Sequence, residues 1–313
     1  MEIGTGPGID EQEPPKGDFV VSATGLVSRT LSVWGRNILT FIILFGILSA
    51  IFTVVRFFVL WMIFGDPGSA QLLMGYMGTD PFTFFVGLFT LMQIGLLPPD
   101  VMNTFVSVSL LLMVVSMIVY AVLVGATIKY SIDDYGRGQA HMGESVSVAM
   151  GRSGTLIMAQ LIVGLISAVL FAPALFYMLL APLTIEALTT FLIVILVTFI
   201  LVLYVSIRLA PTAAVVIVED KSALDSVRRA FDLTGGQFWH VFGGQIVLGI
   251  VVLILDIIVG MFLLGLTFGL GWIGGLLPVV ISGLLFVAIP YVFQAVLYMD
   301  LEARDLETSQ ELW

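Results

Sequence analysis

Residues 238–266 read FWHVFGGQIVLGIVVLILDIIVGMFLLGL, an apolar run with a single formal charge, Asp256. A helix of about 20 such residues crosses the hydrocarbon core of a bilayer. Five further runs have the same character, at residues 37–64, 104–129, 155–180, 188–208 and 277–298. The sequence therefore predicts an all-α integral membrane protein with about six transmembrane helices.

The composition points the same way. Hydrophobic residues make up 59% of the 313-residue chain and charged residues only 11%, whereas soluble domains are about 45–50% apolar even with glycine counted. The chain has no cysteine, which excludes disulfides and thiolate metal sites. It has no basic patch interleaved with aromatic residues, so we expect no nucleic-acid partner.

The formal net charge of −10 comes largely from the two ends of the chain. Residues 1–17 are rich in Gly, Pro and acids, and we interpret them as a disordered acidic cytoplasmic tail. Residues 18–300 form the predicted membrane domain, and residues 301–313 a second acidic cytoplasmic tail.

The positive charges decide the orientation. With six spans, nearly all Lys and Arg residues fall on the same side as both termini, and the opposite loops carry only acids. The cations on that side are Lys16, Arg29, Arg36, Lys129, Arg137, Arg152, Arg208, Lys221, Arg228, Arg229 and Arg304. Cytoplasmic loops carry an excess of Lys and Arg, so we expect a multi-pass cell-membrane protein with both termini cytoplasmic.

One apolar segment, residues 81–97 (PFTFFVGLFTLMQIGLL), is short for a span. Counting it as a seventh span would destroy the charge asymmetry. We interpret it as a re-entrant helix or a helix lying in the outer interface, packed onto the bundle because backbone at membrane depth needs protein or water around it.

Short amphipathic helices precede three of the spans. In the first, Trp34 lies on the apolar face and Arg29 and Arg36 on the polar face. In the third, Arg228 and Arg229 lie on the polar face. Helices with this division lie in the membrane interface.

The boundaries of these helices follow from capping residues. Ser222 and Asp225 form a capping box at the start of the third helix, and a glycine pair at 235–236 ends it. A weaker second copy lies at residues 143–151. We therefore predict three parallel repeats, at about 18–130, 143–208 and 222–300, each an interfacial helix followed by two spans, related by an axis along the membrane normal.

Arg56 and Asp256 are ionisable groups well inside predicted spans, where an unpaired charge is costly. Each lies about 28 Å from the start of its span at 1.5 Å per residue. Equal depth in equivalent repeats predicts an intramembrane ion pair between them. The two residues form either a structural clamp between spans one and five or part of a substrate or proton site, or else Arg56 extends to the outer headgroups.

Glycines form the other pattern. Gly265 and Gly269 make a G-x-x-x-G motif, which Gly271, Gly274 and Gly275 continue. Small residues let helix backbones approach closely, so we expect these glycines to pack spans five and six together or to contact a partner helix.

The sequence shows no convergent catalytic chemistry. His141 and His240 have no acidic ligand at metal-binding spacing. The chain contains no H-E-x-x-H, G-x-S-x-G or P-loop motif. We expect neither an enzyme nor a bound metal or cofactor.

Residues 211–244 begin PTAAVVIVEDKSALDSVRRAFDLTGGQFWHVFG. This stretch resembles the membrane domain found beside glycerophosphoryl diester phosphodiesterases and related uncharacterised membrane proteins of archaea and bacteria. The hydrolase domain of that family has acidic metal ligands and catalytic histidines, and nothing here matches it. The resemblance therefore implies a fold and no activity.

These features favour a non-catalytic membrane protein, a scaffold or accessory subunit that organises lipids or partner membrane proteins, including copies of itself. The alternative is a small transporter or lipid-handling protein with a site near Arg56 and Asp256. The lipid bilayer is the partner common to both.

The charge asymmetry makes a direct prediction about sidedness. A cysteine placed at Asp80 or Asp100 in this cysteine-free chain should react with a membrane-impermeant maleimide added to intact cells, whereas one at Ser222 should react only after lysis. Labelling of the Ser222 variant in intact cells would overturn the orientation.

Overall fold

The computed structural model describes residues 19–76, 99–180 and 184–311. The expected tail at 1–17 and the segment at 81–97 lie outside these residues. Within them, six helical stretches are long and apolar enough to cross a membrane, which confirms the predicted spans. They are Ile38–Phe64, Asn103–Arg137, Met142–Tyr177, Ile185–Val218, Phe238–Leu266 and Trp272–Glu307.

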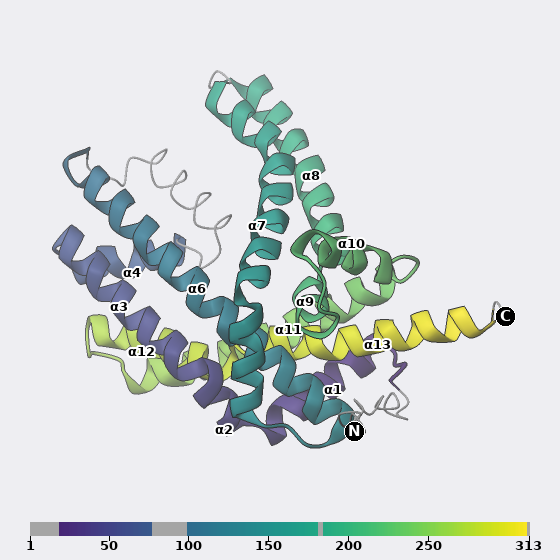
Figure 1. The fold of residues 1–313 in the computed structure, drawn as a ribbon. Coiled ribbons are helices and arrows are strands. Elements are labelled where there is room, and N and C mark those ends of the chain that lie inside the picture. The colour runs from purple at the N-terminus through teal and green to yellow at the C-terminus, as the bar shows by residue number, and fades with distance from the viewer. Residues whose placement is uncertain (1–18, 77–98, 181–183, 312–313) are drawn as a thin grey trace, which may run out of the picture.

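The described residues form helices joined by short connections (Figure 1). In chain order they are α1 (Ala23–Arg36), α2 (Ile38–Phe41), the π-helical turn η1 (Ile42–Gly46), α3 (Ile47–Phe64), α4 (Pro67–Tyr76), α6 (Pro99–Arg137), α7 (Met142–Leu180), α8 (Ile185–Arg208), α9 (Thr212–Val218), α10 (Ala223–Leu233), α11 (Phe238–Leu266), α12 (Trp272–Phe286) and α13 (Ile289–Glu311).

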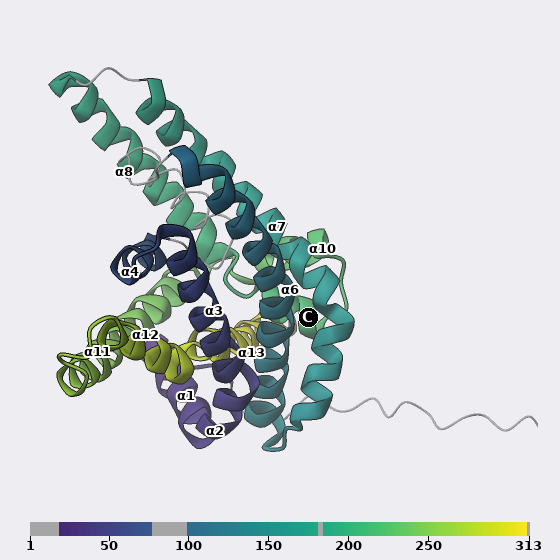
Figure 2. The ribbon, with the colours of Figure 1, turned by 90° about the vertical axis from the view of Figure 1, so that its left-hand side faces the viewer.

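The helices meet at one end and diverge toward the other. Figures 1 and 2 show α7 and α8 leaving α11, α12 and α13 as a long hairpin. At the base of this hairpin, α6 packs along α7 and α13, and α9 packs against α6, α7 and α10. We call this base, formed by α1, α9, α10, the end of α6, the start of α7 and residues 298–305 of α13, the charged end.

The larger apolar core lies toward the charged end. Its fully buried side chains come from most of the helices and include Phe41, Ile128, Leu156, Ile207 and Tyr298. A smaller cluster joins α3, α4, α6 and α12 near the far end. Away from these clusters the spans are open: only 6% of the most apolar window of α11 is buried inside the protein, so its surface faces lipid.

Two of the three expected amphipathic helices are formed as separate elements. The Ser22 side chain caps α1, and the Ser222 hydroxyl accepts the backbone N–H of Asp225 at 3.3 Å at the start of α10. Gly236, at φ +74°, follows the end of α10. The predicted N-cap at Ser222 and the glycine stop are confirmed, but the Asp225 carboxylate accepts the Ser222 hydroxyl and not the backbone N–H of a complete capping box. Both helices bury part of their apolar face, while Leu224 and Phe231 of α10 stay exposed.

The expected separate helix at residues 143–151 is not formed. These residues are the first turns of α7, which runs without a break from Met142 to Leu180. The reason is local: Gly151 and Gly154 lack the left-handed φ of Gly236 and stay within the helix. Nothing therefore turns the chain between the amphipathic segment and the span.

The last span is divided, and it extends further than expected. α12 ends at Phe286 and α13 begins at Ile289, just before Pro290, which cannot donate a backbone hydrogen bond to the preceding turn. α13 then continues to Glu311, so residues 301–311 prolong the last helix.

The first span contains a close contact that the sequence does not reveal. A Cβ on Gly46, in η1, would lie 2.4 Å from the backbone oxygen of Leu284 in α12. The π-helical turn and the missing side chain together let these two helices touch at backbone distance.

Replacing Gly46 by Ala should therefore destabilise the protein by about 1–3 kcal/mol, because a backbone must move to admit the methyl group. Gly35→Ala on α1 is the matched control, since a Cβ there meets nothing within 4 Å. Thermal unfolding in detergent measures both variants. Equal melting temperatures would show that the Gly46 contact is not tight.

Candidate functional site

Asp256 lies on an exposed face of α11. The exposed side chains around it are apolar and include Leu253, Ile254, Ile257 and Ile258. No ion pair to Asp256 is formed within the described part of the chain. The Asp256 carboxylate therefore lies on a helix surface that faces lipid.

Arg56 is half-buried on α3. Its Nη2 atom is buried and has no hydrogen-bond partner in the described structure. The neighbouring titratable group is the hydroxyl of Tyr120, which shares a 3.0 Å hydrogen bond with the Ser49 hydroxyl. Arg56 is thus a half-buried cation with no paired carboxylate among the described residues.

The structure does not bring Arg56 and Asp256 together. Span one packs through α3 and η1 against α4, α6 and α12, whereas α11 packs against α12, α1 and α8. Equal depth along two spans did not place them side by side, and α12 packs against both helices. The predicted ion pair is not formed.

The predicted packing glycines divide into three groups. Gly269 (φ +90°) and Gly271 (φ +60°) form the turn between α11 and α12, where left-handed backbone favours glycine. Gly274 and Gly275 do pack closely: added Cβ atoms would meet the backbone of Thr267 and the side chain of Gln71. A Cβ added at Gly265 would meet nothing within 4 Å, so no other helix of the described residues packs closely on this glycine.

The polar face of α1 is bonded to the bundle. Arg29 donates to the Tyr135 hydroxyl on α6. Trp34 donates from Nε1 to the backbone oxygen of Leu285 at 3.2 Å. These side chains were predicted from the amphipathic pattern, but their intramolecular partners were not.

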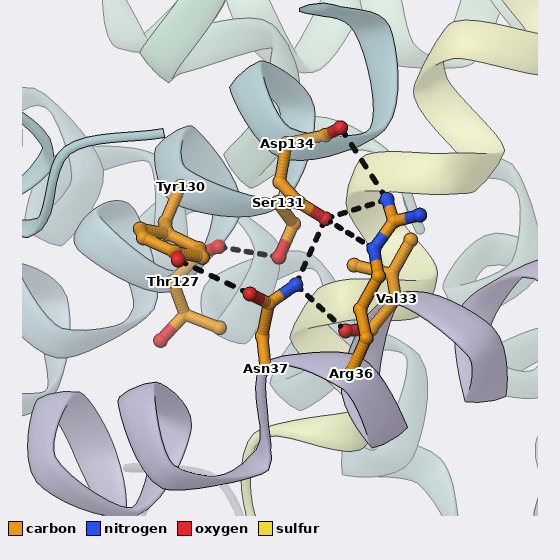
Figure 3. Close-up of polar contacts among 7 residues, drawn as sticks. All are labelled: Val33, Arg36, Asn37, Thr127, Tyr130, Ser131 and Asp134. Atoms are coloured by element: carbon orange, nitrogen blue, oxygen red, sulfur yellow. Dashed lines mark hydrogen bonds and ion pairs between the residues drawn. The ribbon is translucent and has the colours of Figure 1, made fainter. Parts of the chain in front are cut away.

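Asp134 on α6 holds the end of α1 (Figure 3). Its Oδ2 accepts Arg36 Nη2 at 2.6 Å and Arg36 Nε at 2.9 Å. The same oxygen accepts Asn37 Nδ2 at 2.9 Å, while Asn37 Oδ1 accepts the Tyr130 hydroxyl at 3.2 Å. One carboxylate thus fixes the break between α1 and the first span.

Asp300 on α13 holds the start of α1. Its side chain is 0% exposed. Its Oδ1 accepts the backbone N–H of Val21 at 2.8 Å, and its Oδ2 lies 2.8 Å from His240 Nε2 at the start of α11. Arg304 Nε completes the site at 3.0 Å. This one buried group therefore joins three distant parts of the chain.

Glu219, after α9, holds α10. Its Oε1 accepts the Tyr298 hydroxyl at 3.2 Å and Arg229 Nε at 3.4 Å, and Arg229 also donates to Asp305 at 2.9 Å. Burial opposes the charge of Arg229, but its hydrogen bonds and the nearby carboxylates outweigh burial and raise its pKa. Arg228 makes an exposed contact of 3.7 Å to Asp225.

Sequence reasoning missed these three carboxylates. The sequence pattern places Asp300 at the end of the last predicted span and offers no partner for His240. A weak signal was present: Arg304 follows Asp300 by one helical turn, the spacing at which side chains on a helix meet. The other partners are distant in sequence.

A cavity of about 430 Å³ lies where α6, α7, α8, α9 and α13 meet. Its wall carries amides and hydroxyls but no carboxylate or ammonium group among the described residues. The described residues also contain no group of three or more His, Asp or Glu that could hold a metal ion.

Comparison with family models, curated proteins and solved structures finds no match. The candidate sites therefore rest on geometry: the lipid-facing Asp256, the carboxylates of the charged end, and the neutral cavity.

The burial of Asp300 predicts a large effect on stability. Asp300→Ala should cost about 3–5 kcal/mol, because His240, Arg304 and the Val21 N–H lose a shared acceptor inside the protein. Asp232→Ala, at an exposed position of α10, should change stability by less than about 0.5 kcal/mol. Unfolding in detergent micelles measures both variants. Similar effects of the two changes would refute the role given to Asp300.

Proposed function

We propose that this polytopic membrane protein is a non-catalytic accessory or scaffold subunit that docks another membrane protein along α11. The docking surface, which we call the Asp256 face, consists of Gly249, Asp256, Gly260 and the apolar side chains between them. The observation that carries this proposal is a carboxylate on a lipid-facing helix that has no ion-pair partner among the described residues.

The position of Asp256 makes its exposure costly. It lies about 27 Å along the helix from Phe238 and about 15 Å from Leu266, at 1.5 Å per residue. Exposed apolar side chains such as Met261 and Phe262 continue beyond it. An aspartate at the centre of a membrane helix costs about 2.5–3.5 kcal/mol on insertion scales, and the cost falls toward the rim of the bilayer, where this spacing places Asp256. A binding partner that supplies a cation removes much of this cost.

The backbone beside Asp256 is open to close approach. Gly249 lies seven residues before it and Gly260 four residues after it, which places all three on one side of the helix. Cβ atoms at both glycines would meet nothing within 4 Å. Membrane helices associate through small residues of this kind because their backbones can then touch.

The charge selects the type of partner. A symmetric dimer about α11 would place two Asp256 carboxylates opposite each other, and like charges repel strongly in a low-dielectric medium. We therefore assign the Asp256 face to a different chain, with a Lys or Arg inside a membrane span. The resemblance noted for residues 211–244 names no such partner and stays a prediction.

Sidedness and repeats belong to the same proposal. Arg36, Arg152, Arg229 and Arg304 all form ion pairs at the charged end, which supports placing that end and both termini in the cytoplasm.

Repeats one and three are supported by the way they begin. In each, a capped, half-buried amphipathic helix ends just before a span starts. The continuity of α7 weakens the second repeat.

The alternative, a transporter or lipid-handling protein acting near Arg56 and Asp256, loses its predicted site because the two residues lie on helices that do not pack together. The neutral cavity is a separate basis for ligand binding.

The proposal predicts a charge-dependent complex. A cross-linking group placed at residue 253 should first be allowed to react with neighbouring proteins in the host membrane. The full chain should then be purified in mild detergent. We expect a stoichiometric partner cross-linked through a span that carries Lys or Arg, and recovery about tenfold lower for Asp256→Asn, equivalent to about 1.4 kcal/mol. The Asp256→Lys variant should not bind the partner. A second change in the partner, from its Lys or Arg to Asp, should restore binding to the Asp256→Lys variant.

Asp232→Asn is the matched control, and its complex should be unchanged. Equal recovery with wild type and Asp256→Asn would contradict the proposal. So would a cross-link to a second copy of this chain, or recovery of no protein partner.

A further inference from the structure

The cavity between α6, α7, α8, α9 and α13 lies within the apolar part of the bundle. Its volume of about 430 Å³ falls in the range of small-molecule sites. Its wall includes Gln160, Gly164, Ser167, Ser206, Thr212 and Gln294.

The polar groups of this wall are uncharged at neutral pH. Two amides, Gln160 and Gln294, come from α7 and α13, and the Ser206 hydroxyl comes from α8. Two other hydroxyls already donate to their own backbone: Ser167 to Val163 and Thr212 to Leu209. The wall therefore presents amide and hydroxyl groups against an otherwise apolar surface.

Gln294 carries the strongest signal. Its Oε1 is buried and accepts no hydrogen bond from the described residues. A buried acceptor without a hydrogen bond lowers the stability of the folded protein, whereas an aliphatic side chain of similar size would carry no such penalty. A ligand with an N–H or O–H group would satisfy this oxygen.

We propose that the cavity binds the uncharged, hydroxyl- or amide-bearing head of an amphiphile drawn from the bilayer. The head would hydrogen-bond to Gln294 and Gln160, and its chain would lie along the apolar wall. An anionic head fits less well, because no Lys or Arg lines the cavity and a buried charge needs a counter-ion. Arg56 neighbours Tyr120 but is not part of the wall. This site is independent of the Asp256 face.

Gly164 offers a way to close the site. It lines the cavity on α7, and a Cβ there meets nothing within 4 Å. A large side chain at this position can therefore enter the cavity without displacing backbone. Gly151, on the same helix but outside the cavity, has equally open surroundings and provides a matched control.

The test uses the full chain in phosphatidylcholine nanodiscs and a photoreactive diazirine analogue of N-oleoylethanolamine, whose head has one amide and one hydroxyl. We expect saturable labelling within residues 156–167 and 291–294. Gly164→Phe should reduce labelling at least tenfold, and Gly151→Phe should leave it unchanged. Gln294→Leu should reduce labelling several-fold without lowering the melting temperature, which separates ligand recognition from folding.

Two further arms identify the ligand class. A diazirine analogue of oleic acid, with the same chain and an anionic head, should label these segments far more weakly. Free N-acetylethanolamine, which lacks the chain, should not displace the probe. Equal labelling by the oleate analogue, displacement by the free head, full labelling of Gly164→Phe, or no labelling of the wild type would each overturn the proposal.

Discussion

The buried carboxylate of Asp300 joins the N-terminal segment at Val21, the start of α11 at His240, and α13 itself through Arg304. A buried charge is tolerated only when it is fully hydrogen-bonded, so these segments must meet in one geometry. Asp134 and Glu219 act in the same way at the end of α1 and beside α10. The charged end is therefore the part of the molecule whose arrangement is specified most closely.

The membrane arms depend on that base. Beyond the charged end, packing among the spans is sparse, and only 11% of the most apolar window of α7 is buried. Lipid replaces protein around such helices, and apolar contact with lipid does not drive helices together. This is why α7 and α8 can leave the bundle as a hairpin (Figure 2), and why α11 presents an open face with an acid on it.

One of the two proposed sites lies in the closely packed part of the molecule and the other in the sparsely packed part. The neutral cavity lies where helices from the base still converge, so its wall is built by the protein and includes an amide acceptor that the protein does not satisfy. The Asp256 face lies on a part of α11 whose side chains are exposed. A ligand suits the first site because it is concave, and a partner helix suits the second because it is a helix surface with accessible backbone at Gly249 and Gly260.

The sequence by itself determined the helical class, the positions of six spans and the caps of α1 and α10, because each depends on local composition and on residues within one turn. It could not determine which spans lie side by side. The predicted ion pair between Arg56 and Asp256 is not formed for this reason. The depth of a residue along a helix follows from its number, but which helices lie next to each other depends on how the side chains of all the helices pack. The partners of Asp300, the backbone contact at Gly46 and the cavity wall likewise join residues distant in sequence, and only the tertiary structure decided them.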